Sequence, residues 1–307
     1  MTYSGKFSRD TLAALEAAKL DVAEVRRVVT GALAEDLRFG PDVTTESTVP
    51  AEAVAVASVT PRKAGVLAGA TVALAVFDIV LDQGYELLSG VADGRSLRPG
   101  EPALVLRGPV RGLLTAERTA LNLVCHLSGI ATATAAWVRA IAGTGAAVRD
   151  SRKTLPGLRH LEKYAVRCGG GVNHRLGLGD AVLIKDNHVL AAGSITSAMA
   201  AVRARAPELP CEVEVDSLDQ LDEAVAQGAE LVLLDNFTPQ QCAEAVRRVR
   251  PTGSRLEASG GLTLDVARAY AETGVDYLAV GALTHSAPAL DLGLDLDSPD
   301  TRPRRDR

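Results

Sequence analysis

The middle of the 307-residue chain carries five cationic side chains that we expect to gather around one binding site: Arg152, Lys153, His174, Arg175 and Lys185. Clustered cations are costly unless anions lie between them. An arginine offers a planar fork to a carboxylate or phosphate, and a lysine offers a point charge. Any one of these side chains could instead pair with an Asp or Glu at the surface. As a set, they predict a ligand with several negative charges.

Acidic side chains occupy alternate positions in the segment CEVEVD, residues 211–216. In a strand they share one face, which in a barrel can point toward the site. Asp235 ends the apolar run of the next predicted strand. Carboxylates on adjacent strands of a basic pocket suit Mg²⁺, which usually takes one or two of them together with phosphate oxygens of the substrate. Ion pairs with Lys185 or Arg152 are the alternative, and they could also describe the enzyme without ligand.

A glycine-containing turn, Ser259-Gly260-Gly261, follows one predicted strand and precedes a predicted helix. Glycines allow the backbone to approach a ligand closely, and a helix N-terminus presents free N–H groups to an anion. The loops after the last strands of β/α barrels often bind phosphate. Gly281-Ala282, at the end of the next strand, would form the other side of this cradle. The two turns together predict a phosphate site.

Other reaction centres have no signature in the sequence. There is no GxSxG nucleophile motif and no GxGxxG dinucleotide motif, and the five histidines lack zinc-ligand spacing. The four cysteines, Cys125, Cys168, Cys211 and Cys242, lie more than thirty residues apart and predict reduced thiols. The first residues lack the apolar core of a signal peptide, and no uninterrupted apolar stretch of about 18 residues predicts a membrane span. We therefore expect a cytoplasmic protein.

The predicted chemistry needs secondary-structure elements that bring these residues to the same edge of a sheet. Six short apolar runs behave as strands: residues 146–150, 181–185, 212–215, 231–235, 255–259 and 277–280. Clear helical patterns lie between the later ones, at residues 195–205, 218–226, 239–249 and 264–272. This alternation predicts an α/β domain with a parallel sheet, and its site lies at the carboxyl ends of the strands. Because six strands fall short of eight, we predict an incomplete, barrel-like β/α domain, with an open doubly wound sheet as the alternative.

The chain before this domain mixes helix and strand patterns. Residues 21–35 and 71–82 predict helices, and residues 53–59, 85–91 and 103–107 predict strands. We therefore expect a flexible N-terminus over residues 1–20 and an N-terminal α+β sandwich domain over residues 21–116. The barrel-like catalytic domain would cover residues 117–290, and a partly disordered tail would cover residues 291–307.

The composition excludes some functions. The chain has 33 Lys and Arg against 38 Asp and Glu, which gives a net charge of −5, and only 3% of its residues are aromatic. A nucleic-acid binder usually carries a strong basic surface or stacking aromatics. We therefore expect small-molecule substrates, and neither nucleic acid nor membrane as a partner.

The segment DSRKTLPGLRHLEKYAVRCGGGVNHRLGLGDAVLIKDNH, residues 150–188, resembles the signature block of quinolinate phosphoribosyltransferases. The resemblance extends upstream to LAEDLRFGPDVTTESTVP and ERTALNLVCHLSGIAT. Downstream it includes EVEVDSLDQL, LVLLDNF, EASGGL and VGALTHSAPALDLGLDL. It covers nearly the whole chain apart from its two ends, and the combination of motifs is specific to this family.

The resemblance implies a reaction and a cofactor. The family transfers the phosphoribosyl group of phosphoribosyl pyrophosphate to quinolinate, with Mg²⁺, and yields nicotinate mononucleotide, pyrophosphate and CO₂ for de novo NAD biosynthesis. Carried over by motif, Arg118, Arg152, His174, Arg175 and Lys185 would hold the two carboxylates of quinolinate. Lys153, beside Ser151, would contact the pyrophosphate. Glu214 and Asp235 would bind Mg²⁺ or the ribose hydroxyls, so that Lys153, Glu214 and Asp235 are the expected catalytic residues. Ser259, Gly260, Gly261, Gly281 and Ala282 would hold the 5′-phosphate.

The resemblance also implies an assembly. Arg118 would reach the site from the neighbouring subunit of a homodimer, which could itself form a dimer-based hexamer. Three other functions remain alternatives: a molybdenum-transport-associated paralogue of the same fold, a different phosphate-sugar barrel enzyme, and a non-catalytic quinolinate sensor. The second would not need the cationic set, and a sensor could dispense with Glu214 or Asp235, which this sequence keeps.

Overall fold

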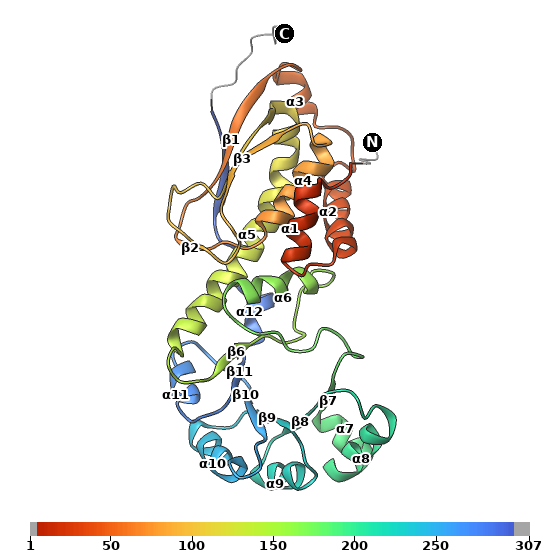
Figure 1. Ribbon diagram of the computed structural model, residues 1–307, viewed down its shortest axis with the longest axis vertical. Coiled ribbons are helices and arrows are strands. Elements are labelled where there is room, and N and C mark those ends of the chain that lie inside the picture. The colour runs from red at the N-terminus through yellow and green to blue at the C-terminus, as the bar shows by residue number, and fades with distance from the viewer. Residues whose placement is uncertain (1–4, 298–307) are drawn as a thin grey trace. The chain divides into compact units, whose positions relative to one another are not determined.

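The structure, a computed structural model, describes residues 5–297 of the chain (Figure 1). Within these residues the chain divides into two compact units. The first comprises residues 5–133, 155–169 and 286–297, and the second comprises Thr134–Thr154 and Gly170–His285. The predicted boundary between residues 116 and 117 differs from this division. It falls inside one long helix, α5 (Val110–Ala140), whose residues belong to both units.

The second unit is built on six parallel strands in the order β6-β11-β10-β9-β8-β7. They are β6 (Ala147–Arg149), β7 (Val182–Ile184), β8 (Cys211–Val215), β9 (Leu231–Asp235), β10 (Arg255–Ser259) and β11 (Tyr277–Ala279). From β7 to β11 each strand lies beside the next one in sequence, without the reversal of order that defines a doubly wound sheet. Over residues 5–297, β6 and β7 remain edges of the sheet. The predicted incomplete, barrel-like β/α domain is therefore confirmed.

Four helices of the second unit cover the outer side of this sheet (Figure 1): α8 (Ile195–Arg205), α9 (Leu218–Ala226), α10 (Pro239–Val249) and α11 (Ala267–Ala271). Two short helices follow strands: α7 (Asp186–Ala192) comes after β7 and contacts α8, and α12 (Ala282–His285) comes after β11. A Ser or Thr side chain caps the N-terminus of α8, α9 and α10, accepting the N–H of the residue three positions on. Such caps satisfy backbone donors that the helix itself leaves open.

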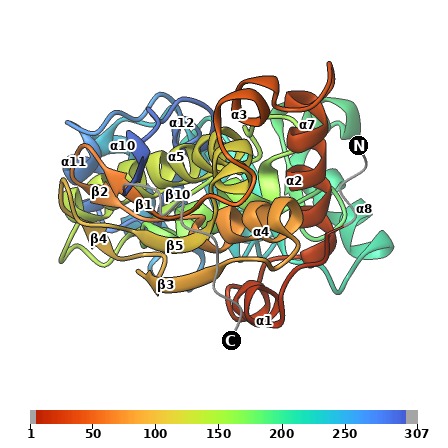
Figure 2. The same ribbon diagram turned by 90° about the horizontal axis from the view of Figure 1, so that it is seen from above.

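The first unit contains an antiparallel sheet in the order β12-β1-β5-β3 and a small two-stranded sheet of β2 and β4. The strands are β1 (Val54–Pro61), β2 (Gly65–Val66), β3 (Glu86–Gly90), β4 (Ser96–Leu97), β5 (Leu104–Pro109) and β12 (Leu292–Leu296). The helices are α1 (Arg9–Ala17), α2 (Val22–Asp36), α3 (Val43–Thr48), α4 (Ala70–Leu81), the first part of α5, and α6 (Arg159–Cys168). Helices α1, α2 and α4 contact one another beside the larger sheet (Figures 1 and 2).

Two predictions about the chain ends differ from the structure. Residues 9–17, expected to be flexible, form α1, which Ser8 caps and which buries Thr11 and Leu15. Residues 292–296, expected to belong to a partly disordered tail, form β12 and pair with β1. The partner strand lies far away in sequence, so local sequence patterns do not reveal this pairing. The rest of the predicted tail, residues 298–307, lies outside the described residues.

Helix α5 is long and apolar enough to cross a membrane, judged by length and composition alone. Slightly more than half of its apolar window, 56%, is buried within the protein. A buried core helix of a folded domain has the same length and composition, so α5 carries no membrane assignment.

Candidate active site

A cavity of about 670 Å³ opens at the carboxyl ends of the parallel strands, and all the residues that line it belong to the second unit. Except for Arg118, every site residue that the sequence predicts lines this cavity: Ser151, Arg152, Lys153, His174, Arg175, Lys185, Glu214, Asp235, Ser259, Gly260, Gly261, Gly281 and Ala282. Arg118 lies in α5, in the first unit. The prediction that the site lies at the carboxyl ends of the strands thus identified residues from six strands and their loops that surround one cavity.

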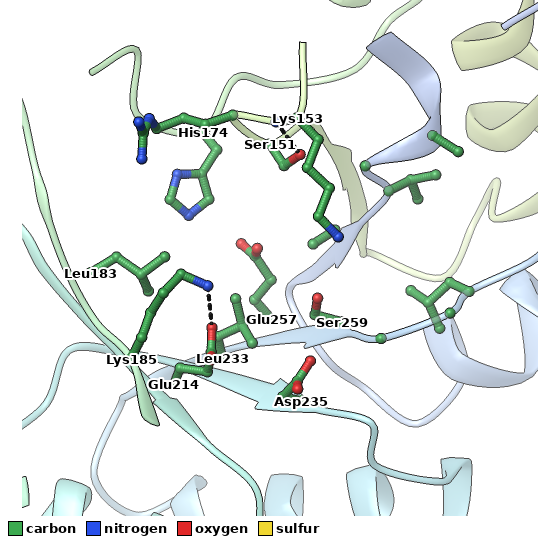
Figure 3. Close-up of a pocket in the computed structure, with 18 of the residues that line it drawn as sticks. Ser151, Lys153, His174, Leu183, Lys185, Glu214, Leu233, Asp235, Glu257 and Ser259 are labelled. Atoms are coloured by element: carbon green, nitrogen blue, oxygen red, sulfur yellow. Dashed lines mark hydrogen bonds and ion pairs between the residues drawn. The ribbon is translucent and has the colours of Figure 1, made fainter. Parts of the chain in front are cut away.

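Figure 3 shows the arrangement inside the cavity. His174 and Lys185 lie on one side, and Ser259 and Asp235 lie on the other, with the carboxyl group of Glu257 between them. We call Arg152, His174, Arg175 and Lys185 the cationic wall. We call Glu214, Asp235 and the two glycine turns, residues 259–261 and 281–282, the carboxylate–glycine wall.

Two arginines of the cationic wall are poised for an anion. The Nε atoms of Arg152 and Arg175 are buried, and neither has a hydrogen-bond partner among the described residues. Arg175 donates from Nη1 to the carbonyl oxygen of Ala181 at 3.0 Å. Burial, and then the nearby charge of Arg152, lower the pKa of Arg175. A buried donor without a partner is unfavourable, so a ligand oxygen that accepts from these groups would be bound strongly.

His174 is held by the loop before β7. That loop is tied to β6, since the N–H of Val172 donates to the carbonyl oxygen of Val148 at 2.8 Å. The buried carboxylate of Asp150 accepts the backbone N–H of His174 at 2.7 Å. The ring accepts the N–H of Arg175 at Nδ1, 2.7 Å away, so Nε2 carries the proton and donates to Glu212 at 2.8 Å. Both ring nitrogens are thus fixed by the chain itself.

The two carboxylates predicted to bind Mg²⁺ both line the cavity. Glu214 accepts Lys185 Nζ at 2.8 Å (Figure 3), which is the ion pair that the sequence offered as the alternative for the ligand-free enzyme. Asp235 accepts the side-chain N–H of Asn236 at 2.8 Å. These oxygen donors suit a hard divalent cation, because Mg²⁺ needs only one or two protein carboxylates besides substrate oxygens and water.

The glycine turns bring backbone close to the cavity. Gly260 has φ +98°, and a Cβ atom there would collide with the side chain of Asn236 and lie 2.7 Å from its backbone nitrogen. A Cβ atom at Gly281 would lie 2.9 Å from Cδ of Lys153. Gly260 therefore needs glycine, whereas a side chain at Gly281 would displace the flexible side chain of Lys153. The glycines leave room for backbone N–H groups to meet a phosphate.

A buried charged cluster beneath the cavity was not predicted from the sequence. Glu257 on β10 is 0% exposed, and its Oε2 accepts from Arg149 Nη1. Glu212 is 4% exposed and lies 3.6 Å from the same guanidinium. Burial, and then the charge of Glu212, raise the pKa of Glu257 to about 8. The sequence did offer one signal that Glu257 faces the cavity. Glu257 precedes the predicted site residue Ser259 by two positions, so both side chains lie on the same face of the strand.

This cluster also has the spacing of a metal site. One ligand atom from each of His174, Glu212 and Glu257 lies within 4.8 Å of the others. Arg149, however, already neutralises charge between the two carboxylates, and the His174 nitrogen that faces Glu212 carries a proton. Glu214 and Asp235, which face the cavity without such a guanidinium contact among the described ion pairs, fit a cation better.

Comparisons with known proteins match most of the chain. A family model described as "Quinolinate phosphoribosyl transferase, C-terminal domain" matches residues 130–295, and its N-terminal counterpart matches residues 42–128. The chain is 62% identical to the "Nicotinate-nucleotide pyrophosphorylase [carboxylating]" of Mycobacterium leprae over 88% of this chain and 96% of that protein. It is 40% identical to the probable enzyme of the same name from Bacillus subtilis, over 89% and 93%.

Solved structures agree with these sequence matches. The nicotinate-nucleotide pyrophosphorylase of Francisella tularensis matches with a TM-score of 0.86 and 38% identity, over 90% of this chain and 96% of that chain. The corresponding protein of Ehrlichia chaffeensis matches with a TM-score of 0.85 and 34% identity, over 91% and 100%.

Proposed function

Because the chain belongs to the quinolinate phosphoribosyltransferase family, we propose that its cavity binds quinolinate and phosphoribosyl pyrophosphate side by side and joins them. The protein is a carboxylating nicotinate-nucleotide pyrophosphorylase, a pentosyltransferase of NAD biosynthesis. It transfers the phosphoribosyl group to quinolinate and yields nicotinate mononucleotide, pyrophosphate and CO₂. The observation that supports our assignment of roles is that one cavity is lined by two arginines with buried, unpartnered Nε donors and also by Glu214, Asp235 and the two glycine turns.

The cationic wall holds the two carboxylates of quinolinate. Arg152 and Arg175 have buried Nε donors that lack partners within the described chain, and a carboxylate is the anion that a guanidinium fork binds best. His174 is held in one orientation by Asp150 and Glu212, so it shapes this wall without moving. Lys185 exchanges its ion pair with Glu214 for a carboxylate of the substrate when the cavity fills.

The carboxylate–glycine wall holds phosphoribosyl pyrophosphate. Glu214 and Asp235 bind Mg²⁺ or the ribose hydroxyls, and the turns at residues 259–261 and 281–282 receive the 5′-phosphate. Lys153 approaches the pyrophosphate, and Ser151 fixes its backbone by accepting the Lys153 N–H at 3.1 Å. When bound, Mg²⁺ supplies positive charge to the leaving pyrophosphate.

The chain's own residues support the chemistry by position and charge. Positive charge develops at C1 of the ribose as pyrophosphate leaves, and the carboxylates of Glu214 and Asp235 stabilise that charge. Lys153 stabilises the negative charge that forms on the leaving group. The cationic wall holds the nitrogen of quinolinate against C1, so that the bond forms without a further loss of translational freedom. The resulting pyridinium accepts electrons, and the adjacent carboxylate leaves as CO₂.

The assembly and the location of the protein belong to the same proposal. We propose a homodimer, or a dimer-based hexamer, in which Arg118 completes the quinolinate pocket of the neighbouring subunit. Arg118 lies in α5 of the first unit, whereas every residue that lines the cavity belongs to the second. A cytoplasmic location is the one at which phosphoribosyl pyrophosphate, a soluble anion, would meet the enzyme.

The test is product formation from quinolinate, phosphoribosyl pyrophosphate and Mg²⁺, with nicotinate as the parallel substrate. We expect nicotinate mononucleotide and CO₂ from quinolinate, little product from nicotinate, and loss of activity when EDTA removes the metal. Glu214→Gln should raise the Mg²⁺ concentration at half-maximal rate. A folded sample that forms no product from either acid would contradict the proposal and favour the quinolinate sensor or the molybdenum-transport-associated paralogue. Full activity in the presence of EDTA would show that the reaction does not need Mg²⁺.

A further inference from the structure

Glu257 has a position that the roles above do not use. Its carboxyl group lies between His174 and Lys185 on one side and Ser259 and Asp235 on the other (Figure 3). In the sheet it lies in register with Glu214, because both residues pair with Leu233 on β9, the strand between them. Quinolinate held by the cationic wall and ribose held by the carboxylate–glycine wall must be joined in this space. The new bond, and the carbon that loses CO₂ beside it, are therefore expected close to Glu257.

The groups around Glu257 leave it with a proton. Arg149 on β6 is the one cation paired with it among the described ion pairs, and that guanidinium also neutralises Glu212 on β8. Asp150, which follows β6, adds a further negative charge, while Tyr277 on β11 stacks on Arg149 at 4.9 Å. His174 accepts the backbone N–H of Arg175 at Nδ1 and is paired with Glu212 through Nε2. Two buried carboxyl groups thus share one guanidinium, and a buried carboxylate without a full counter-charge is strongly unfavourable.

The free oxygen of Glu257 faces no partner within the described chain. Oε2 accepts from Arg149, whereas Oε1 is buried and has no hydrogen-bond partner. A carboxyl group with one oxygen anchored on arginine and the other carrying a proton without an acceptor is poised to donate that proton to a ligand. The raised pKa of Glu257, caused first by burial, keeps the proton bound at neutral pH.

The reaction needs such a donor. When the C–C bond to the leaving carboxylate breaks, CO₂ departs and the electron pair stays on C2 of the pyridinium ring as an ylide. Nicotinate mononucleotide carries hydrogen at that carbon, so one proton must arrive. Until it does, CO₂ can return to the carbanion and re-form the bond.

We propose that Glu257 is the acid that protonates C2 after CO₂ leaves, an inference that rests on the proposed function. The Oε1–H bond breaks, its proton forms the C–H bond with the electron pair on C2, and Glu257 becomes a carboxylate held by Arg149. Solvent restores the proton when the product has left. No oxidant or reductant takes part, and the charge lost by the ylide appears on Glu257.

The experiment compares Glu257→Gln with wild type in a single turnover that follows pyrophosphate and CO₂ separately. Glutamine keeps the shape and the neutral charge but is no acid. We expect pyrophosphate release within about threefold of wild type and CO₂ release slowed about 100-fold or more, as for loss of a general acid. Glu257→Asp should recover part of the CO₂ rate. In wild type, kcat/KM for quinolinate should fall as pH rises through about 8, and Glu257→Gln should lack this fall.

Glu212→Gln is the matched control. It alters the same buried cluster and the hydrogen bond to His174, but Glu212 does not line the cavity. We expect it to raise KM for quinolinate and to leave the ratio of CO₂ to pyrophosphate release unchanged. The fall in kcat/KM should remain but move to lower pH, because the charge of Glu212 helps to raise the pKa of Glu257.

The outcomes separate this inference from the function itself. Pyrophosphate and CO₂ release that slow in parallel in Glu257→Gln would overturn the inference and leave a structural role. So would a variant with wild-type rates and pH profile. If Glu257→Gln does not fold, Glu257→Asp with a wild-type rate and an unshifted pH profile would overturn it equally. Failure of the wild-type protein to form nicotinate mononucleotide would instead refute the proposed function.

Discussion

Arg152 shows how one side chain can matter to substrate binding and little to folding. It follows β6 in the cavity wall, and its buried Nε has no partner among the described residues. Arg152→Ala therefore removes a charge-assisted hydrogen bond to substrate, worth about 1.5–3 kcal/mol, and should lower kcat/KM for quinolinate roughly 10- to 100-fold. Steady-state kinetics measure the loss, and the melting temperature should stay within a few degrees of wild type.

Arg205→Ala on α8 is the control for charge alone, because Arg205 is exposed and does not line the cavity. It should keep wild-type kinetics. A normal rate for Arg152→Ala would remove that arginine from the site.

Glu257 also predicts how stability depends on pH. Its pKa in the folded protein is raised to about 8, so folding favours the protonated form. The stabilisation is complete below the pKa of an unfolded Glu, near 4.3, and is lost as pH rises to about 8. The free energy of unfolding should thus decline between these pH values in wild type and decline less in Glu257→Gln. Denaturant titrations at pH 5 and pH 8.5 measure the free energy of unfolding of both proteins. An equal decline between these pH values in wild type and Glu257→Gln would contradict the raised pKa.

At the residue scale, the site residues at or just after the ends of strands could be predicted from the sequence. The charged residues within the strands could not. Lys185 and Asp235 could be found because a polar residue that ends an apolar run marks a strand end. Glu257 and Arg149 lie inside short strands, and their significance depends on a cross-strand contact between residues 108 positions apart. No local pattern reports such a contact.

The turn after β10 sets an element-scale test. Gly260 and Gly261 both have positive φ, but a Cβ atom at Gly260 would strike Asn236, whereas nothing lies within 4 Å of one at Gly261. The left-handed conformation costs a non-glycine residue about 1–2 kcal/mol at either position. Gly260→Ala adds a steric collision, so it should lower the melting temperature more than Gly261→Ala and raise KM for phosphoribosyl pyrophosphate further. Equal effects on both measurements would mean that the close approach to Asn236 is unimportant.

Elements with strong local signals were predicted well. The bounds of α8, α9 and α10 match the prediction, because each has a Ser or Thr cap and a periodic apolar face. Helix α3 was not among the predicted helices, since its six residues bury only Thr45 and show no apolar period. Strands β2 and β4 have two residues each, too few to produce an alternating pattern.

At the scale of the whole molecule, the proposed sharing of Arg118 can be tested by mixing two variants that are each strongly impaired. Arg118→Ala and Arg152→Ala should each lose activity, because each removes a cation from the same pocket. If the pocket uses Arg118 of one subunit and Arg152 of the other, random reassociation restores one intact site in each mixed dimer, or about a quarter of wild-type activity. Activity is measured after the two variants have exchanged subunits. No recovery in proven mixed dimers, or an active monomer on gel filtration, would refute the shared site.

The pairing of β1 with β12 has a consequence for synthesis on the ribosome. Pro61 pairs with Leu292, which the ribosome adds 231 residues later. At about 5–20 residues per second, β1 waits roughly ten to fifty seconds for that neighbour, with one edge open to other strands. All segments of the second unit have been translated by then, so it can fold first although it comes later along most of the chain. The sheet that begins with β1 is thus completed only when β12 has been translated. The exposed edge of β1 is where a chaperone would protect the nascent chain longest.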